Sequence, residues 1–141
     1  MPDTPWMVVR RTAVEDDPDG DVRIVAMADT EAGNNRYLMV QCPLTEPDAQ
    51  DAELGMDSYC LLDEKGAVHY GGVRRAVLRG DTLQLTFDEE ATAELELPGD
   101  TVTLLLRVPD EQVRRLGQGL HDVLSYGAAR HRPEVLQLGQ S

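Results

Sequence analysis

Short runs in which apolar and polar residues alternate fill most of this chain. Alternation with a period of two is typical of β-strands that bury one face of a sheet and expose the other. The pattern therefore predicts an antiparallel sheet of several short strands. The runs lie at Trp6–Val14, Val22–Asp29, Tyr37–Cys42, Ser58–Leu62, Ala67–Tyr70, Arg74–Leu78, Leu83–Phe87 and Thr101–Val108.

Turn residues separate the runs and define the pairing of one hairpin. Asp19-Gly20 and Gly80-Asp81 are strong hairpin signals, because both residue types suit the backbone of tight turns. If Gly80-Asp81 forms the loop, each residue before it opposes a defined residue after it. The predicted pairs are Leu78 with Leu83, Ala76 with Leu85, and Arg74 with Phe87.

One long stretch after Pro109 has the helical period instead. Its apolar residues recur every three or four positions, which is typical of a helix that lies on a sheet. Gly117 and Gly119 interrupt the stretch, and each makes a helix less stable by about 1 kcal/mol than alanine would. Asp88 predicts the N-terminal cap of a shorter helix. The apolar stripe of the long helix consists of Val113, Leu116, Leu120, Val123 and Leu124.

These elements predict a single domain over residues 1–127. We expect an α+β fold, a mostly antiparallel β-sheet meander with a C-terminal helix packed on one face. Gly127 is a natural end for that helix. Residues 128–141 contain little to bury, so we expect a flexible C-terminal tail there.

The chain is strongly acidic, with 26 acidic and 13 basic residues and a formal net charge of −13 at pH 7. This charge argues against nucleic acid as a partner, because basic residues must neutralise its phosphates, and against anionic membrane surfaces. A basic protein partner would be attracted and would associate faster at low salt. The alternative interpretation is that the acids only keep the protein soluble.

The cysteines indicate a reducing compartment. Cys42 and Cys60 both lie inside apolar runs, which is typical of buried, reduced thiols. The N-terminus lacks the pattern of a secretion signal, and no apolar run approaches the roughly 18 residues of a membrane span. We therefore expect a cytoplasmic protein.

Few side chains are arranged for chemistry. The run from Glu15 to Gly20 has acids at the first, third and fifth positions of a calcium loop, but Ala26 occupies the place of the closing glutamate. Cys42, Cys60 and His69 lack the paired spacing of zinc ligands. We therefore expect no metal and no cofactor. A small cytosolic enzyme remains an alternative, because Cys60 and His69 lie on neighbouring strands of one hairpin.

An acidic segment between the third and fourth runs is the candidate for recognition. Its acids are interleaved with large apolar side chains, a combination that suits contact with a basic protein surface. The alternative is a solvated loop with an apolar anchor in the core. The candidate contact residues are Glu46, Asp48, Asp51, Glu53, Met56, Asp57 and Tyr59.

Several segments between Val22 and Leu124 also carry a resemblance to a known family. They are Tyr37–Gln41, Gln50–Cys60 and Tyr70–Val73, followed by Leu83–Ala91 and the closing strand and helix. The segment Glu-Leu-Gly-Met-Asp together with the later Tyr-Gly-Gly is an unusual combination. In these residues the chain resembles the immunity protein 10 family of bacterial polymorphic toxin systems.

The resemblance implies a small cytosolic protein that binds and neutralises a cognate toxin made by the same cell. It implies inhibition by binding, without catalysis and without a cofactor, and it carries no catalytic residues over to this chain. A basic toxin would suit the charge. A structural homo-oligomeric subunit, such as a homodimer formed through an exposed sheet edge, is a further alternative.

Overall fold

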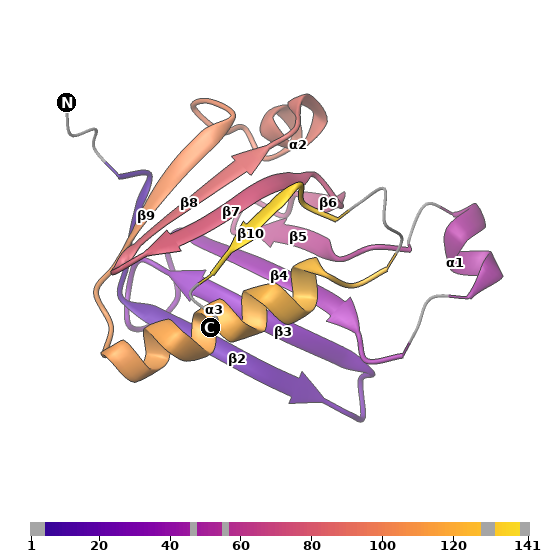
Figure 1. The fold of residues 1–141 in the computed structure, drawn as a ribbon, viewed down its shortest axis with the longest axis horizontal. Helices are drawn as coiled ribbons and strands as arrows, with labels where there is room; N and C mark the ends of the chain where they lie inside the picture. The colour runs from indigo at the N-terminus through magenta and orange to yellow at the C-terminus, as the bar shows by residue number, and fades with distance from the viewer. Residues whose placement is uncertain (1–4, 46–47, 55–56, 128–131, 139–141) are drawn as a thin grey trace.

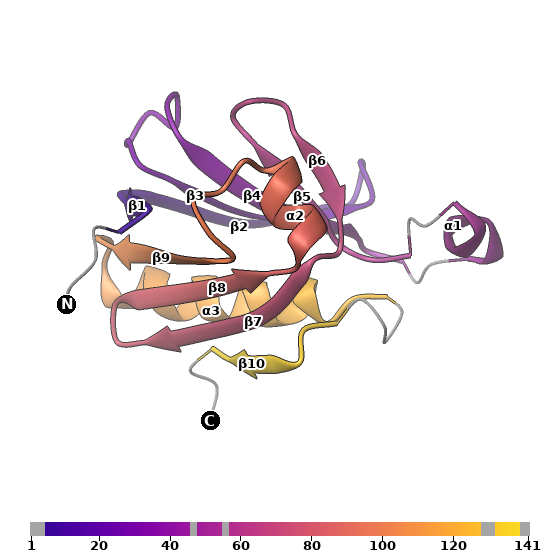
Figure 2. The same cartoon turned by 90° about the horizontal axis from the view of Figure 1, so that it is seen from above.

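Two five-stranded sheets form the body of the protein (Figures 1 and 2). The computed structural model describes residues 5–45, 48–54, 57–127 and 132–138. Sheet A contains β1 (Met7–Val9), β9 (Thr101–Leu106), β8 (Thr82–Phe87), β7 (Val73–Arg79) and β10 (Val135–Gln137), in that spatial order. Sheet B contains β2 (Arg11–Asp17), β3 (Val22–Ala28), β4 (Tyr37–Pro43), β5 (Cys60–Asp63) and β6 (Val68–Tyr70), in that order. The helices are α1 (Ala49–Glu53), α2 (Glu89–Glu94) and α3 (Asp110–Leu124).

The predicted α+β fold with a C-terminal helix is confirmed, and the meander is split between the two sheets. Sheet B is an antiparallel meander in chain order. Sheet A has an antiparallel centre of β7, β8 and β9, and its two outer strands run parallel to their neighbours. No helix among the described residues is long and apolar enough to cross a membrane.

The first predicted strand, Trp6–Val14, is wrong as a single element. The structure divides it into β1 and β2, which belong to different sheets. The buried side chains show the reason: Met7 and Val9 lie in the core of sheet A, whereas Val14 packs on the core from sheet B. The residues whose side chains point into the core thus have odd numbers before Arg10 and even numbers after it. At Arg10 the chain passes from one sheet to the other.

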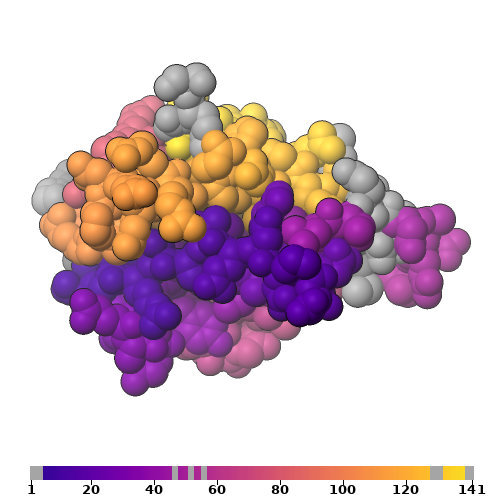
Figure 3. Space-filling view, turned by 90° about the horizontal axis from the view of Figure 1, so that it is seen from below, coloured from indigo at the N-terminus to yellow at the C-terminus, as the bar shows by residue number. Residues whose placement is uncertain are grey.

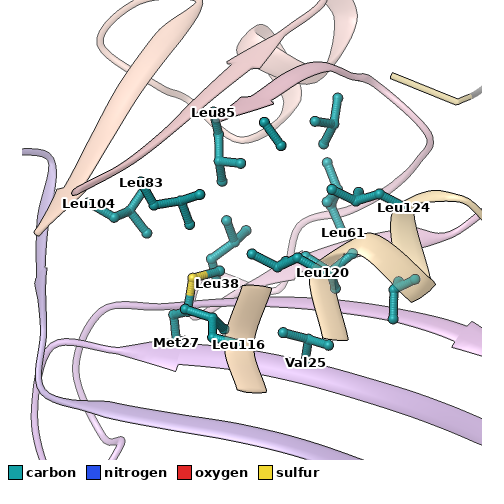
Figure 4. Close-up of a cluster of buried hydrophobic side chains, with 14 of the residues drawn as sticks. Val25, Met27, Leu38, Leu61, Leu83, Leu85, Leu104, Leu116, Leu120 and Leu124 are labelled. Carbon is teal, nitrogen blue, oxygen red and sulfur yellow. The ribbon is translucent and has the colours of Figure 1, made fainter. Parts of the chain in front are cut away.

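Helix α3 lies between the two sheets and contributes to one shared core. Its buried residues Leu116, Leu120 and Leu124 lie close to side chains of both sheets (Figure 4). Seen from above, the helix runs beneath sheet A, and in the first view it lies in front of sheet B (Figures 1 and 2). The side chains labelled beside it in the close-up are Val25, Met27, Leu38, Leu61, Leu83, Leu85 and Leu104.

The two glycines of α3 allow this close packing. A Cβ atom at Gly117 would lie 2.5 Å from the carbonyl oxygen of Leu138, and one at Gly119 would lie 2.8 Å from a methyl carbon of Val14. Two residues along a helix differ by about 200° in direction, so the glycines face opposite sides. One glycine therefore lets sheet A approach, and the other lets sheet B approach.

The expected flexible tail is corrected for residues 132–138. Strand β10 pairs with β7 at the edge of sheet A, and Leu138 is 3% exposed. Glu134 donates its backbone N–H to Arg74 at 2.7 Å and forms an ion pair with the same arginine. Leu138 belongs to the core and Leu136 packs against it, so this segment has more to bury than its composition suggested.

The predicted hairpin register is confirmed for two pairs and wrong for the third. Leu78 opposes Leu83 and Ala76 opposes Leu85, but Phe87 opposes Val73. A bulge between Val73 and Arg75 inserts Arg74 as an extra residue, which shifts the pairing by one. The predicted cap is also confirmed, because the Asp88 carboxylate accepts the Ala91 N–H at 2.8 Å.

Replacing Gly117 with alanine is expected to destabilise the fold. The new Cβ would overlap a backbone carbonyl, and such overpacking costs about 1–3 kcal/mol, which exceeds the roughly 1 kcal/mol gained in helix propensity. Urea unfolding measures the free energy of unfolding. Gly99→Ala is the control, since nothing lies within 4 Å of its Cβ position, and it should change that free energy by less than about 0.5 kcal/mol. A Gly117→Ala variant as stable as the wild type would contradict the packing of α3 against β10.

Candidate functional site

The acidic segment that the sequence singled out lies at the margin of the molecule. Helix α1 stands apart from both sheets, at the end where β4 finishes and β5 begins (Figures 1, 2 and 3). Asp48 and Glu53 are exposed there, and the side chain of Leu54 is 63% exposed. Glu46 and Met56 lie outside the described residues, as does the side chain of Asp51.

The last two candidates, Asp57 and Tyr59, are corrected by their burial. Asp57 is 4% exposed and Tyr59 is fully buried, so neither side chain can belong to a contact surface. The Tyr59 hydroxyl accepts the N–H of Val73 at 2.8 Å and donates to the carbonyl of the same residue. Burial raises the pKa of Tyr59. This tyrosine joins sheet B to the start of β7 in sheet A, which is a structural role.

The geometry does not support the proposed thiol–imidazole pair. Cys60 opposes Tyr70 and His69 opposes Leu61 in the β5–β6 ladder. Directly opposed residues point to the same face of a sheet, and neighbouring residues point to opposite faces. The Cys60 thiol and the His69 imidazole therefore lie on opposite faces. Burial also raises the pKa of Cys60, which keeps the thiol in its unreactive neutral form.

Metal binding finds no support in the described residues. No group of three or more His, Cys, Asp or Glu side chains in that part of the chain could hold a metal ion. In the acidic β2–β3 turn, the Asp17 carboxylate accepts the backbone N–H groups of Asp19 and Gly20, at 3.1 and 3.3 Å. This carboxylate thus stabilises the turn itself.

The structure reveals an uncovered apolar surface on sheet B that sequence reasoning missed. The strand residues of sheet B that belong to the core cluster, such as Val25, Val40 and Leu61, all share the inner face. We call the opposite side the outer face of sheet B. One apolar row crosses all five strands of this face. It consists of Ala13, Ala26, Met39, Leu62 and Val68, each opposing the next.

The neighbouring row on this face is also largely apolar. It runs from Glu15 through Ile24, Gln41 and Cys60 to Tyr70. At the edge strand β6, Val68 is 49% exposed and Tyr70 is 37% exposed. The available signal in the sequence was that β3, β4 and β5 are apolar at both odd and even positions, which is unusual for strands with one wet face.

Two hollows lie on this face, and the first is partly lined by the central row. The first, of about 330 Å³, is lined mainly by small side chains and by one cation, Arg11. The second, of about 280 Å³, lies at the end from which α1 emerges and includes Asp21, Pro43 and Tyr70. The outer face is therefore hollowed and apolar at its centre, and the acidic α1 segment lies beside it. The small residues of the first hollow are Ala13, Ala26, Ala28, Ala32 and Gly33.

Comparison with known proteins gives one finding. The family model described as Immunity protein 10 matches residues 8–114. The match includes sheet B entirely and continues into α3. No curated protein and no solved structure matches the chain.

Tyr59→Phe is expected to destabilise the protein without changing its surface. Removing the hydroxyl leaves the buried Val73 N–H without its acceptor, which costs about 1–3 kcal/mol. Urea unfolding measures the loss. Tyr37→Phe, at a partly exposed tyrosine of β4, is the control and should change the free energy of unfolding by less than about 0.5 kcal/mol. Equal stability of Tyr59→Phe and the wild type would refute the role of the hydroxyl.

Stability is expected to fall in alkaline solution through Cys42. Burial raises the pKa of this thiol from 9.0 to about 11. A group with a raised folded-state pKa contributes stability that is complete below the unfolded-state pKa and is lost as pH rises towards the folded-state value. The free energy of unfolding should therefore decrease between about pH 9 and pH 11. The decrease should be shallower in Cys42→Ala, and identical slopes for both proteins would contradict this assignment.

Proposed function

Because the chain belongs to the immunity protein 10 family, we propose that it binds and neutralises a cognate bacterial toxin. The observation that carries this proposal is the family match over residues 8–114. The protein inhibits by occupying a surface that the toxin needs, and it performs no chemistry of its own. It acts in the cytoplasm of the cell that makes the toxin.

The charge of the chain supports a toxin with a basic functional surface, such as a nuclease. A net charge of −13 attracts a basic partner over several ångströms and accelerates association. The exposed Asp48, which precedes α1, and Glu53, its last residue, offer negative charge next to the outer face of sheet B. We retain these two residues as contact residues of the proposed interface.

Protection of growth tests the function directly. Cells that express the toxin domain encoded beside this gene should stop growing, and co-expression of this protein should restore growth. The purified pair should also elute as one complex from a size-exclusion column. Growth arrest that persists at high expression of the soluble, folded protein would refute the proposal.

Charge reversal of the α1 segment is expected to slow association. The double variant Asp48→Lys with Glu53→Lys should reduce the association rate about tenfold at low salt, because it removes attraction near the interface. Stopped-flow fluorescence measures the rate, and added salt should narrow the difference between variant and wild type.

The control for this variant is Glu94→Lys with Asp100→Lys, at exposed positions near α2. It makes the same change in net charge far from α1 (Figure 1). Its association should slow much less than that of the α1 variant. Equal slowing by both variants would mean that only the overall charge matters, and α1 would then be excluded as part of the interface.

A further inference from the structure

The outer faces of the two sheets carry different kinds of side chain. On sheet A, the outward side chains of the central strand β8 are Thr82, Gln84 and Thr86, which suit contact with water. On sheet B, the outward side chains of the central strand β4 are Tyr37, Met39, Gln41 and Pro43, of which only Gln41 is an amide. An antiparallel sheet with one wet face normally follows the first pattern. The apolar outer face of sheet B is therefore an exception within the same molecule.

The size of this face fits the centre of a protein interface. Strands lie about 4.8 Å apart, so the apolar row that crosses five strands extends over about 20 Å. Standard interfaces bury about 800 Å² on each partner, with an apolar centre and a polar rim. The hollow of about 330 Å³ lined by Ala13, Ala26 and Ala28 leaves room for a protruding side chain of a partner.

Acidic residues surround this apolar centre. Glu15 ends the second row on β2, Asp17 lies two residues further along the same face, and Asp21 lines the second hollow. At the other end, Glu31 adjoins the first hollow, where its carbonyl accepts a hydrogen bond from Arg11 at 2.9 Å. Among the residues that line the two hollows, Arg11 is the one cation.

The acidic residues around the outer face of sheet B form a negatively charged rim. This charge distinguishes a second copy of the chain from a basic protein as the partner that binds there. A second copy of this chain would bring a further net charge of −13 and would set acidic rims against each other, which costs free energy. A basic protein surface would pair with the same rim. Complementary charge at the rim and an apolar centre together describe a heterologous protein partner.

We infer that the outer face of sheet B is the docking surface for the toxin, and that it takes a basic surface with a protruding apolar side chain. This inference rests on the proposed function. The apolar side chain enters the hollow beside Ala26 and packs on Met39. Basic side chains around it pair with the acids on β2 and in the β2–β3 turn. Helix α1 then lies at the border of the same interface.

Matched substitutions on the two sheets test the inference. Ala26→Arg fills the hollow and adds a cation to the outer face of sheet B, whereas Gln84→Arg makes a comparable change on the outer face of sheet A. The probe is the catalytically inactivated toxin domain encoded by the adjacent gene, with affinity measured by calorimetry. Ala26→Arg should weaken binding by about tenfold or more, and Gln84→Arg should bind like the wild type. Circular dichroism and thermal unfolding establish that both variants are folded.

A second variant and a measurement on the wild type keep the test valid even if Ala26→Arg fails to fold. Val68→Lys changes a residue that is 49% exposed on the edge strand β6, and it should also weaken binding. In hydroxyl-radical labelling of the wild-type complex, oxidation of Met39 should fall relative to the free protein. Oxidation of the buried Met27 should stay low in both states.

The outcomes separate this inference from the function on which it rests. If the wild type neither binds the toxin domain nor protects growth, the proposed function fails and the inference fails with it. If the wild type binds but Ala26→Arg and Val68→Lys bind equally well, with Met39 labelled as in the free protein, the docking surface alone is refuted. A wild-type dimer in light scattering that Ala26→Arg dissociates would assign the face to a second copy and would also overturn the inference.

Discussion

The close approach of helix α3 to both sheets is the contact on which the rest of the fold depends. Gly117 lies against the backbone at Leu138, and Gly119 lies against the side chains of Val14 and Val25, so at both points the helix meets a different sheet with no side chain of its own in the way. Core packing is sensitive to single methyl groups. The helix therefore determines the separation of the sheets, and the cost of glycine in helix propensity is offset by the packing that it allows.

A second set of tight contacts holds the segment that follows α1. Gly127 pairs with Ser58 in an isolated bridge, and a Cβ atom on Gly127 would overlap the carbonyl oxygen of Asp57. Tyr59 then enters the core and bonds to Val73 in the other sheet. These contacts explain how an exposed acidic helix can stand apart from the sheets while the chain from Asp57 onwards is held against both of them. They also explain why acids close in sequence differ in role: Glu53 is exposed, and Asp57 is buried.

The inner and outer faces of the two sheets differ in what they contribute to the fold. The inner faces of both sheets and the stripe of α3 form one apolar core, and the outward side chains of the central strand β8 of sheet A are polar. The outer face of sheet B carries apolar residues that contribute nothing to that core. An exposed apolar surface of this kind promotes association, so its presence in a strongly acidic protein is explained most directly by a partner that covers it. Binding by such a surface is consistent with the function of an immunity protein.

The sequence by itself determined much about this protein. The period of two predicted the strands, the period of three to four predicted α3, and Asp88 and Gly80-Asp81 predicted a cap and a hairpin, because these signals depend on local backbone geometry. The family could also be identified from its motifs, and the net charge supports the proposal of a basic partner. Only the tertiary structure decided that the first run divides between two sheets, that residues 135–137 join a sheet edge, and that Tyr59 is buried. Each of these depends on contacts between residues far apart in the chain, and local patterns carry no information about such contacts. The outer face of sheet B belongs to the same category, since its row of side chains exists only after five separate strands have paired in register.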